Sequence, residues 1–423
     1  MVGIIWILKL YFIFTVVVMV IYGIRHYIFT YNRLYYPQRK YCQDILDTDV
    51  FSVSVVIPMH NEEAVAEGVL QALLRSDYPE DKLEIIPIND FSEDKTQEIL
   101  DKYAQTDKRV HPLHRFEGDR GKPAALNEAM KLAKGEIIIV FDADYIPARD
   151  LVRKLSIGFL DPQVGAVMGR VVPVNTSKNI LTRLLDLERS GGYQVDQQAR
   201  YNMDLLPQYG GTVGGFRKAL LMDTGSFNIR VLAEDTELTY RLFCRGWKVS
   251  YANSAECYEE APESWEVRAR QIQRWSRGHN QCMWRYFVPV LKSTYLNFWE
   301  KLDGMLLLCI YMMPVILLLG LIDSLLLFFM DEMHIIAGWL FLIFLGAYNT
   351  FGNFAPFFEI GTACFLDGAR QRVFLLPYIA FNFYFYMWFI TKGFFQSILD
   401  LITHRKATWQ KTARFRQEKG GTV

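Results

Sequence analysis

The residues EIIIVFDAD, from Glu136 to Asp144, decide how this chain folds, because an apolar run rich in β-branched residues ends directly in two carboxylates. A run of this length and composition predicts a buried strand, from Glu136 to Phe141. Open α/β sheets bind their ligands in the crevice at the carboxyl ends of the strands. Asp142 and Asp144 therefore stand where a ligand is expected to bind.

Strands and helices alternate on both sides of this run. The pattern predicts further strands at 52–58, 83–89, 110–113 and 164–172, and helices at 61–75, 92–103, 122–134, 179–198, 234–245 and 264–286. Asn61 is expected to cap the first helix, and Gly135 is expected to stop the third. This alternation predicts an α/β domain with a mostly parallel sheet and helices on both faces.

A glycine-rich stretch, Gly210 to Gly215, follows the predicted helix at 179–198. Glycine lets the backbone pass close to another group or adopt a positive φ. The stretch is therefore either a ligand-contacting loop or a flexible connection, and the residues alone leave both interpretations open.

Apolar segments long enough for a bilayer lie at both ends of the chain. Residues 4–24 are nearly all apolar apart from Lys9, and a span needs about 20 such residues. We favour an uncleaved anchor over a signal peptide, because the apolar core is long and no small-x-small cleavage site is evident. Three more apolar blocks lie at 305–330, 335–358 and 373–399, and Pro314 and Pro356 are expected to kink the first two.

Basic residues near these segments predict the orientation in the membrane, but they conflict at the carboxyl end. By the positive-inside rule, the domain after the first segment is cytosolic, because a basic group follows that segment: Arg25, His26, Arg33, Arg39 and Lys40. The same rule predicts a cytosolic loop at Arg370 and Arg372 and a cytosolic tail at 404–416. If the chain crosses the membrane once between this loop and the tail, the tail lies outside the cell. Either residues 373–399 are re-entrant or interfacial, or one basic cluster misleads.

The composition excludes some classes of partner. Lys plus Arg number 46, as do Asp plus Glu, so the net charge is zero. No basic tract with interleaved aromatics resembles a nucleic-acid arm, and we expect no nucleic-acid partner. The six cysteines are far apart and form no CxxC pair, which fits reduced thiols better than a disulfide framework or a zinc site.

The two carboxylates after the central strand suit a divalent cation. A nucleotide sugar loses a nucleoside diphosphate when it reacts, and that departure is difficult unless an ion neutralises the oxygens that gain charge. Mg2+ and Mn2+ prefer carboxylate oxygens and water. Asp144 is our candidate metal ligand and Asp142 a candidate contact to the donor. The side chain of Lys122 either binds the diphosphate as a point charge or is exposed to solvent at the start of a helix.

Glu234 and Asp235 open another predicted helix. An acceptor hydroxyl has a very high pKa, so a carboxylate must take its proton as the new bond forms, and Asp235 is our candidate general base. The positive end of the helix is expected to favour the ionised form of Asp235. Acidic pairs are also common at helix starts as caps, and the pair taken alone favours that capping interpretation.

Gln271, Arg274 and Trp275 lie on one face of a predicted helix, because they are three and four residues apart. A tryptophan ring stacks on sugar rings, and an arginine fork binds phosphate oxygens in a bidentate manner. The alternative is an amphipathic helix at the membrane surface with ordinary aromatic anchors.

Taken together, these elements resemble the family 2 glycosyltransferases, especially the processive, membrane-integrated synthases of cellulose, chitin, hyaluronan and poly-N-acetylglucosamine. The resemblance covers roughly residues 52–286 and the flanking membrane helices. The elements that carry it are, in order, IPMHNEE (57–63), IND (88–90), RGKPAALNEA (120–129), FDAD (141–144), AED (233–235) and QIQRW (271–275). A set with this order and spacing is highly specific for the family.

The resemblance implies a GT-A domain that transfers a hexose from a UDP-sugar with inversion. On the donor side, Glu62 and Asp90 would contact the uridine, and Lys122 would lie near the diphosphate. Asp142 would hold the nucleotide, and Asp144 would hold the metal.

The resemblance also implies roles on the acceptor side of the site. Asp235 would be the base, and Arg274 with Trp275 would frame the diphosphate and the acceptor sugar. Contacts to the acceptor are expected from Gly214, Gly215, Glu234, Gln271 and Trp275.

The chain departs from the usual pattern of the family at two positions. The usual threonine before the Glu-Asp pair is Ala233, which leaves the proposed base unchanged. The usual glycine after Asp90 is Phe91, so the turn over the uridine is expected to differ in shape. In the tail, Trp409, Thr412 and Arg414 resemble the gating segments of some synthases, with a plain basic tail as the alternative.

These inferences divide the chain into five parts: an N-terminal anchor at 1–28, a cytosolic GT-A domain at 45–262, interfacial helices at 263–300, a transmembrane bundle at 301–400 and a basic tail at 401–423. We expect a multi-pass plasma-membrane enzyme with a cytosolic catalytic domain. It would polymerise β-linked hexose from UDP-glucose or UDP-N-acetylglucosamine and move the growing polysaccharide through its own helices.

Other functions compete with this expectation. A non-processive transferase would glycosylate a lipid carrier or a diacylglycerol, although the QIQRW element is typical of polymer-making members. A transporter with a nucleotide-sensing domain is the rival from another class, but few ionisable residues interrupt the carboxyl-terminal apolar blocks. A dehydrogenase is disfavoured because no GxGxxG follows the first strand.

Overall fold

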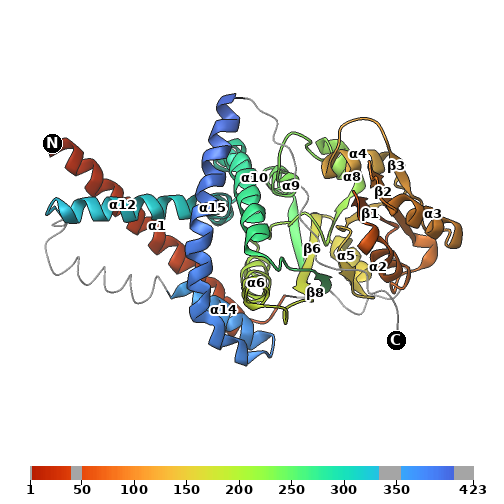
Figure 1. Ribbon diagram of the computed structural model, residues 1–423, viewed down its shortest axis with the longest axis horizontal. Coiled ribbons are helices and arrows are strands. Elements are labelled where there is room, and N and C mark those ends of the chain that lie inside the picture. The colour runs from red at the N-terminus through yellow and green to blue at the C-terminus, as the bar shows by residue number, and fades with distance from the viewer. Residues whose placement is uncertain (1, 40–49, 333–353, 404–423) are drawn as a thin grey trace.

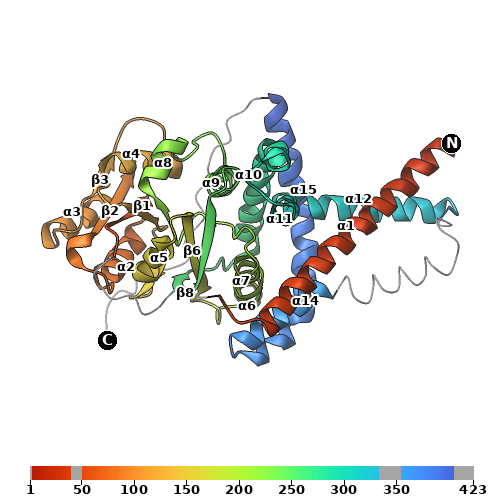
Figure 2. The same cartoon turned by 180° about the vertical axis from the view of Figure 1, so that it is seen from behind.

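The computed structural model describes residues 2–39, 50–332 and 354–403, and Figure 1 shows its two parts. An α/β domain forms one part. Long helices from both ends of the chain form the other part: the helices at Val2–Tyr35 and Met313–Phe329 project away from the α/β domain, whereas the helix at Leu376–Thr403 runs crosswise beside it, as the reverse view in Figure 2 also shows.

A single sheet forms the centre of the α/β domain. Within the described residues its strand order is β3-β2-β1-β4-β7-β6-β8-β5. The pairs among β1 to β4 are parallel, as is β6 with β8, whereas β7 runs antiparallel to both of its neighbours. The strands are β1 Val53–Met59, β2 Leu83–Asp90, β3 Leu113–Arg115, β4 Ile137–Val140, β5 Ile146–Pro147, β6 Val164–Pro173, β7 Gly214–Arg217 and β8 Lys248–Glu259.

Helices cover both faces of this sheet, because successive side chains of a strand point to opposite faces. In β4, Ile137 and Ile139 pack in one apolar cluster, and Ile138 and Val140 pack in the other. The first cluster includes side chains of α2 (Glu63–Leu74), α3 (Thr96–Thr106) and α5 (Leu151–Ile157). The second includes those of α4 (Lys122–Leu132), α8 (Lys218–Thr224), α9 (Glu234–Phe243) and α10 (Trp265–Lys292). The predicted α/β architecture is confirmed.

Two local predictions about helix ends are wrong. Asn61 does not cap α2: the cap position is Glu62, and Asn61 adopts φ of +54° while its side chain accepts a hydrogen bond from the backbone of Glu93. Gly135 does not end α4, whose last residue is Leu132. A Cβ atom at Gly135 would lie 2.4 Å from the backbone nitrogen of Ser54, so the glycine allows a close approach to β1 instead.

The second half of the sheet departs most from the predicted pattern. The last two glycines of the stretch 210–215 belong to β7, and the long strand β8 was not predicted at all. The predicted strand at 110–113 is shifted, since β3 begins at Leu113. The predicted helix at 179–198 is α6 (Ile180–Ser190), a π-helical turn (Gly191–Gln197) and α7 (Gln198–Asn202).

Three helices of the described chain are long and apolar enough to cross a membrane: Gly3–Tyr35, Ile310–Phe329 and Arg370–Thr403. The first is α1 (Val2–Tyr35). The predicted block at 305–330 is divided between α11 (Phe298–Leu308), a 3-10 turn and α12 (Met313–Phe329). Pro314 lies in the first turn of α12, where proline is tolerated, so it starts a helix rather than kinking one.

The remaining membrane predictions fall partly outside the described residues. Most of the block at 335–358 lies outside them, and its end forms the start of α14 (Ala355–Leu366), with Pro356 in the first turn. The block at 373–399 corresponds to α15 (Leu376–Thr403) and the short turn before it. The tail segment with Trp409, Thr412 and Arg414 lies outside the described residues.

Buried ion pairs join α1 to the α/β domain. The guanidinium of Arg25 contacts Asp303 of α11 and Asp196 of the π-helical turn, each at 3.0 Å. Arg200 of α7 pairs with the same two carboxylates. Because a buried charge without a partner costs several kcal/mol, this closed set fixes how α1 meets the domain.

We predict that Gly214→Ala destabilises the protein. A Cβ atom there would lie 2.6 Å from the ring of Tyr209 and 2.8 Å from the carbonyl oxygen of Val167. Overpacking of this kind costs about 1–3 kcal/mol, so the Tm in detergent should fall. Gly68→Ala, in α2 with nothing within 4 Å of the added atom, is the control and should leave the Tm unchanged or raise it. Equal Tm values for the two variants would contradict the packing described.

Candidate active site

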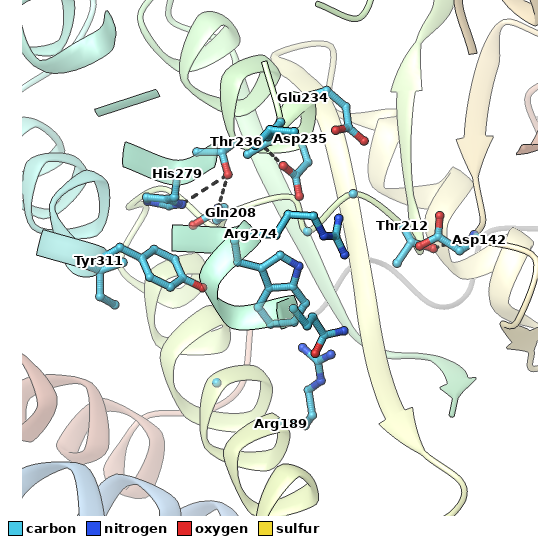
Figure 3. Close-up of a pocket in the computed structure, with 18 of the residues that line it drawn as sticks. Asp142, Arg189, Gln208, Thr212, Glu234, Asp235, Thr236, Arg274, His279 and Tyr311 are labelled. Atoms are coloured by element: carbon cyan, nitrogen blue, oxygen red, sulfur yellow. Dashed lines mark hydrogen bonds between the residues drawn. The ribbon is translucent and has the colours of Figure 1, made fainter. Parts of the chain in front are cut away.

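One cavity of about 1380 Å³ lies between the carboxyl ends of the central strands and the helices that project from the domain. Figure 3 shows residues of α9, α10 and the strand ends around it. The cavity brings together almost all of the predicted site residues: Glu62, Asp90, Lys122, Asp142, Asp144, Glu234, Asp235, Gln271, Arg274 and Trp275. These residues come from segments up to about half the chain apart, so the fold gathers them as the motifs predicted.

Asp90 and its neighbours form one end of the cavity. One oxygen of Asp90 pairs with Arg115, and the other accepts a hydrogen bond of 2.9 Å from the backbone nitrogen of Gly121. A carboxylate has about four lone-pair positions, so both oxygens keep room for a ligand. Phe91 adopts φ of +57°, the region that glycine enters freely, and its ring lies 4.5 Å from the guanidinium carbon of Arg120. Phe91 therefore adopts a φ that glycine would adopt without strain, and the different shape of the turn stays a prediction.

Lys122 connects three segments at the centre of the cavity. Its Nζ donates to Asp142 Oδ1 at 2.7 Å and to the carbonyl oxygen of Gly211 at 2.6 Å, and it lies 3.9 Å from Glu234. Burial alone would lower the pKa of Lys122, but Asp142 and Glu234 more than offset this, so its pKa is raised and it stays charged. The alternative of a solvated helix start is excluded, because the side chain is mostly buried.

The donor set at the end of β4 fits a divalent cation. Asp142 and Asp144 supply carboxylate oxygens, which Mg2+ and Mn2+ prefer. Among the described residues, no group of three or more His, Cys, Asp or Glu side chains converges as a metal cluster. Asp142 and Asp144 are therefore the two residues at this strand end that could hold an ion.

Glu234 and Asp235 are half-buried carboxyl groups that line the cavity, rather than surface caps. Burial raises the pKa of Glu234 to about 7, with Lys122 lowering it and Asp235 raising it further. Burial also raises the pKa of Asp235, against the lowering effect of the Thr236 backbone N–H, which donates to its Oδ1 at 2.7 Å. The expectation that the helix end favours the ionised form is confirmed, because the backbone N–H groups of Asp235 and Thr236 lower the pKa of Asp235; burial outweighs them, so the net pKa is raised. A raised pKa suits a general base, since proton transfer is most efficient when the pKa is nearer to the working pH.

A small polar network holds the start of α9 in place. The hydroxyl of Thr236 accepts a hydrogen bond from Gln208 at 2.9 Å and lies 3.4 Å from His279 of α10, as Figure 3 shows. Burial lowers the pKa of His279 to about 4, so its ring is neutral. A Cβ at Gly278 would lie 2.9 Å from the Cβ of Ala233, so α10 packs directly against the residue where the family usually has threonine.

The QIQRW element presents its three key side chains to the cavity. Gln271 accepts a hydrogen bond of 2.8 Å from Arg268, whose guanidinium carbon lies 5.1 Å from the centre of the Trp275 ring. Arg189 of α6 lies 5.6 Å from the same ring. Cation–π contacts of this kind fix the orientation of the indole. Arg274 lies between Asp235 and Asp142 in Figure 3.

Gly214 and Gly215 do not line the cavity, in contrast to the prediction. Both are buried in β7, where Gly214 packs against Tyr209 and Gly215 lies against β4. The glycine-rich stretch instead reaches the cavity through Gly210, Gly211 and Thr212. Gly211 has φ of +83°, and a Cβ there would lie 3.0 Å from Asp235 Oδ2, so the close approach expected of this stretch occurs at Gly211.

Sequence reasoning missed several residues of the cavity wall. Arg189 and Glu259 form an ion pair of 2.7 Å, and the other oxygen of Glu259 accepts from Tyr145. Tyr311 lies beside His279, with ring centres 4.9 Å apart. None of these belongs to a recognisable motif, and they come from separate elements, α6, β8, the turn before β5 and a 3-10 turn, so the sequence held no signal that could have found them.

Comparison with known proteins agrees with this geometry. Residues 54–222 match the model of the family described as Glycosyl transferase family 2. The chain is 28% identical over 427 residues to "Probable glycosyltransferase YdaM" of Bacillus subtilis strain 168, over 99% of this chain and 98% of the relative. A solved structure of a mannosyltransferase from Pyrobaculum calidifontis, in complex with GDP-Man and Mn2+, superimposes with a TM-score of 0.60. It is 20% identical and covers 93% of this chain and 99% of its own, which shows a shared GT-A-type fold.

We predict that Glu234→Gln raises the Tm more at pH 8 than at pH 5. The pKa of Glu234 rises from 4.5 to about 7 on folding, so the folded chain holds the proton more tightly than the unfolded chain. Its favourable contribution is complete below pH 4.5 and is lost as the pH rises through 7. Glutamine stays neutral, so the variant escapes this loss. The gain should be a few degrees, since about 1 kcal/mol moves the Tm of a domain of this size by roughly 2–4 °C.

The control for this prediction is Glu128→Gln. Glu128 pairs with Lys131 at 2.9 Å on the surface of α4, where both side chains are about half exposed or more. Its effect on Tm should be small and nearly the same at both pH values. A Glu234→Gln effect that also does not change with pH would contradict a protonated Glu234 in the folded chain.

Proposed function

We propose that this chain is a membrane-integrated enzyme that transfers hexose units, with inversion, from a UDP-sugar to an acceptor at the cytosolic face of the membrane. We further propose that it repeats the transfer and so builds a β-linked polysaccharide. The observation that carries the proposal is a single cavity that holds both the carboxylates after β4 and the start of α9, with Arg274 and Trp275 facing them. A family 2 domain and a GT-A-type fold are consistent with it.

The proposed reaction assigns one task to each side chain. The acceptor hydroxyl attacks the anomeric carbon of the donor, the bond from that carbon to the diphosphate breaks, and Asp235 takes the hydroxyl proton. The diphosphate leaves with the electron pair of the broken bond. Lys122 and Arg274 carry positive charge next to the place proposed for the diphosphate, and so stabilise the negative charge that it gains. A bound Mg2+ or Mn2+ would neutralise the same oxygens, held by Asp144 and by Asp142 nearby.

The shape of the cavity supports an acceptor that arrives from the membrane side. Beyond Trp275 the cavity continues between membrane helices, with walls that include Gly23 of α1, Leu317 of α12 and Met387 of α15. A growing polymer placed there would have its end at Asp235 and its older units among these helices. Tyr311 and Trp275 offer rings on which sugar units stack.

The apolar walls of this same part favour one other candidate, a single transfer to a lipid. Met19, Ile310, Pro314 and Met387 line it, and such side chains suit an acyl or prenyl chain as an acceptor. Chromatographic sizing of the product separates the two functions. A ladder or a high polymer supports the synthase, and one discrete glycolipid supports the lipid transferase.

We predict that Asp235→Asn abolishes transfer but leaves donor binding nearly unchanged. Loss of a general base typically costs 100-fold to 10,000-fold in rate, because the amide cannot take the proton. Asp223→Asn, on the exposed side of α8, is the matched control and should retain full activity. UDP binding by calorimetry and UDP release by a coupled assay measure the two effects. Polymer elongation at the normal rate by Asp235→Asn would disprove the assignment of the base.

We predict that Asp144→Ala raises the Mn2+ concentration needed for half-maximal donor binding at least about tenfold, because it removes the carboxylate that we assign as the direct protein ligand of the ion. Binding of a UDP-sugar in a Mn2+ titration measures this without turnover. Unchanged manganese dependence would contradict the role of Asp144.

The donor itself is identified by a panel of nucleotide sugars. UDP-glucose, UDP-N-acetylglucosamine and GDP-mannose are each supplied to the purified full chain in the presence of Mn2+. We expect UDP release from one UDP-hexose and little release from GDP-mannose, the compound bound in the structurally similar mannosyltransferase. Turnover of GDP-mannose alone would overturn the proposed donor.

A further inference from the structure

Helices α10 and α15 lie side by side over most of their length, as Figures 1 and 2 show. Contacts between them recur along both helices in the same order. Arg268 donates to the Tyr386 hydroxyl at 3.0 Å, Gln273 donates to Gln396 at 3.0 Å, and Arg277 pairs with Asp400. A Cβ at Gly393 would lie 2.5 Å from the carbonyl oxygen of Gln273, so the two backbones nearly touch.

Helix α10 belongs to the catalytic domain and cannot enter the bilayer. It carries arginines along its length, at positions 268, 270, 274, 277 and 285, and a charged side chain within the hydrocarbon layer costs at least about 2.5–3.5 kcal/mol. Its other side packs on α9, where Tyr286 donates to Glu237 at 2.6 Å. A helix that runs beside α10 along its whole length therefore stays at the same depth relative to the membrane as α10, outside the hydrocarbon layer.

The side of α15 that faces away from α10 is an exposed apolar stripe. The buried side follows helical spacing through Ile379, Tyr386, Ile390, Gly393 and Ser397. The exposed side is almost entirely aromatic and aliphatic: Phe374, Tyr378, Phe381, Tyr384, Trp388, Phe395, Leu399 and Ile402. The turn that precedes α15 begins this stripe, since Phe374 is 83% exposed. We call these eight residues the aromatic stripe.

The composition of the aromatic stripe differs from that of a membrane span. In a span, Trp and Tyr gather at the two ends, where the helix meets the interfaces. Here Tyr384 and Trp388 lie near the middle of α15, and the ammonium of Lys392 lies 5.3 Å from the Trp388 ring. Amphipathic rings and a cation spread along the whole helix suit the headgroup boundary, where one side is wet and the other apolar.

The direction of α15 also differs from that of the other apolar helices. In Figure 1, α12 projects away from the catalytic domain, α1 runs obliquely beside it, and α15 runs crosswise between the domain and both of them. Lys9 of α1 and Glu332 after α12 pair at 2.7 Å at the far end, and Tyr22 of α1 contacts Leu306 of α11 at the near end. Helices α1 and α12 therefore extend through the same layer, the one expected to be the bilayer, and α15 lies along the edge of that layer next to the α/β domain.

We propose that α15 does not cross the bilayer but lies flat on the leaflet next to the catalytic domain, with the aromatic stripe inserted among the lipids of that leaflet. The partner of this surface is lipid, because the surface is continuous with α1 and α12. This arrangement removes the conflict between the basic clusters: the segment at Arg370 and Arg372 and the chain after Thr403 are on the same side of the membrane. The proposal does not depend on which sugar or acceptor the site uses.

Labelling at the two ends of α15 tests the proposal. Gln371→Cys and Thr403→Cys, both exposed positions, are treated with a membrane-impermeant maleimide in intact cells and in inverted vesicles. Both should react only in inverted vesicles. Gly3→Cys on α1, with open space around it, should react only in intact cells. The unchanged chain measures the background from native cysteines. Any other pattern for Gln371→Cys and Thr403→Cys overturns the flat arrangement.

Depth measurements test the same proposal without relying on sidedness. Phe381→Cys, Trp388→Cys and Phe395→Cys are spin-labelled in the full chain in liposomes, and depth is measured by the relaxing effects of oxygen and a nickel chelate. These positions are seven residues apart, so neighbouring labels are about 10 Å apart along the helix. A flat helix gives three similar, shallow depths. Depths that change by about 10 Å from one label to the next would show that α15 spans the bilayer and would overturn the proposal.

Discussion

The site depends on the ammonium of Lys122, which holds three segments of the chain around one point. It contacts Asp142 after β4 and the carbonyl of Gly211 in the loop before β7, and it lies within 4 Å of Glu234 at the start of α9. Four buried or half-buried carboxylates would repel one another strongly in this cavity without a cation among them. The glycine at 211 is part of the same constraint, because it lets the loop approach both Lys122 and Asp235. The position of this ammonium therefore determines how these three segments surround the centre of the cavity.

The second constraint is helix α10, which connects the chemistry to the membrane. One side of α10 carries Gln271, Arg274 and Trp275 into the cavity, and Gly278 packs against the residue before the acidic pair of α9. Another side lies along α15. A shift of α10 would thus move the side of the cavity that carries Trp275 together with α15, and so with the surface that we propose to contact lipid.

The sequence predicted the site better than it predicted the second half of the fold. Motif residues such as Asp142 follow a strand, and strand ends meet at one edge of a sheet, so their convergence followed from the pattern. β7 was not predicted because its glycines have poor strand propensity, and its place between β4 and β6 overrides that propensity. The lowering effect of the helix end on the pKa of Asp235 followed from the sequence, but the net rise did not, because burial is a property of the fold. Tyr311 and Arg189 were missed because only packing between distant segments brings them to the cavity.

The central claim is that one cavity positions a nucleotide sugar against Asp235. The most direct measurement is a cryo-electron microscopy structure of the full chain with Mn2+ and a non-hydrolysable UDP-sugar. The account predicts density for the diphosphate between Lys122, Asp144 and Arg274, with the anomeric carbon facing Asp235. Density for the nucleotide sugar at a place that Asp235 cannot reach would contradict it.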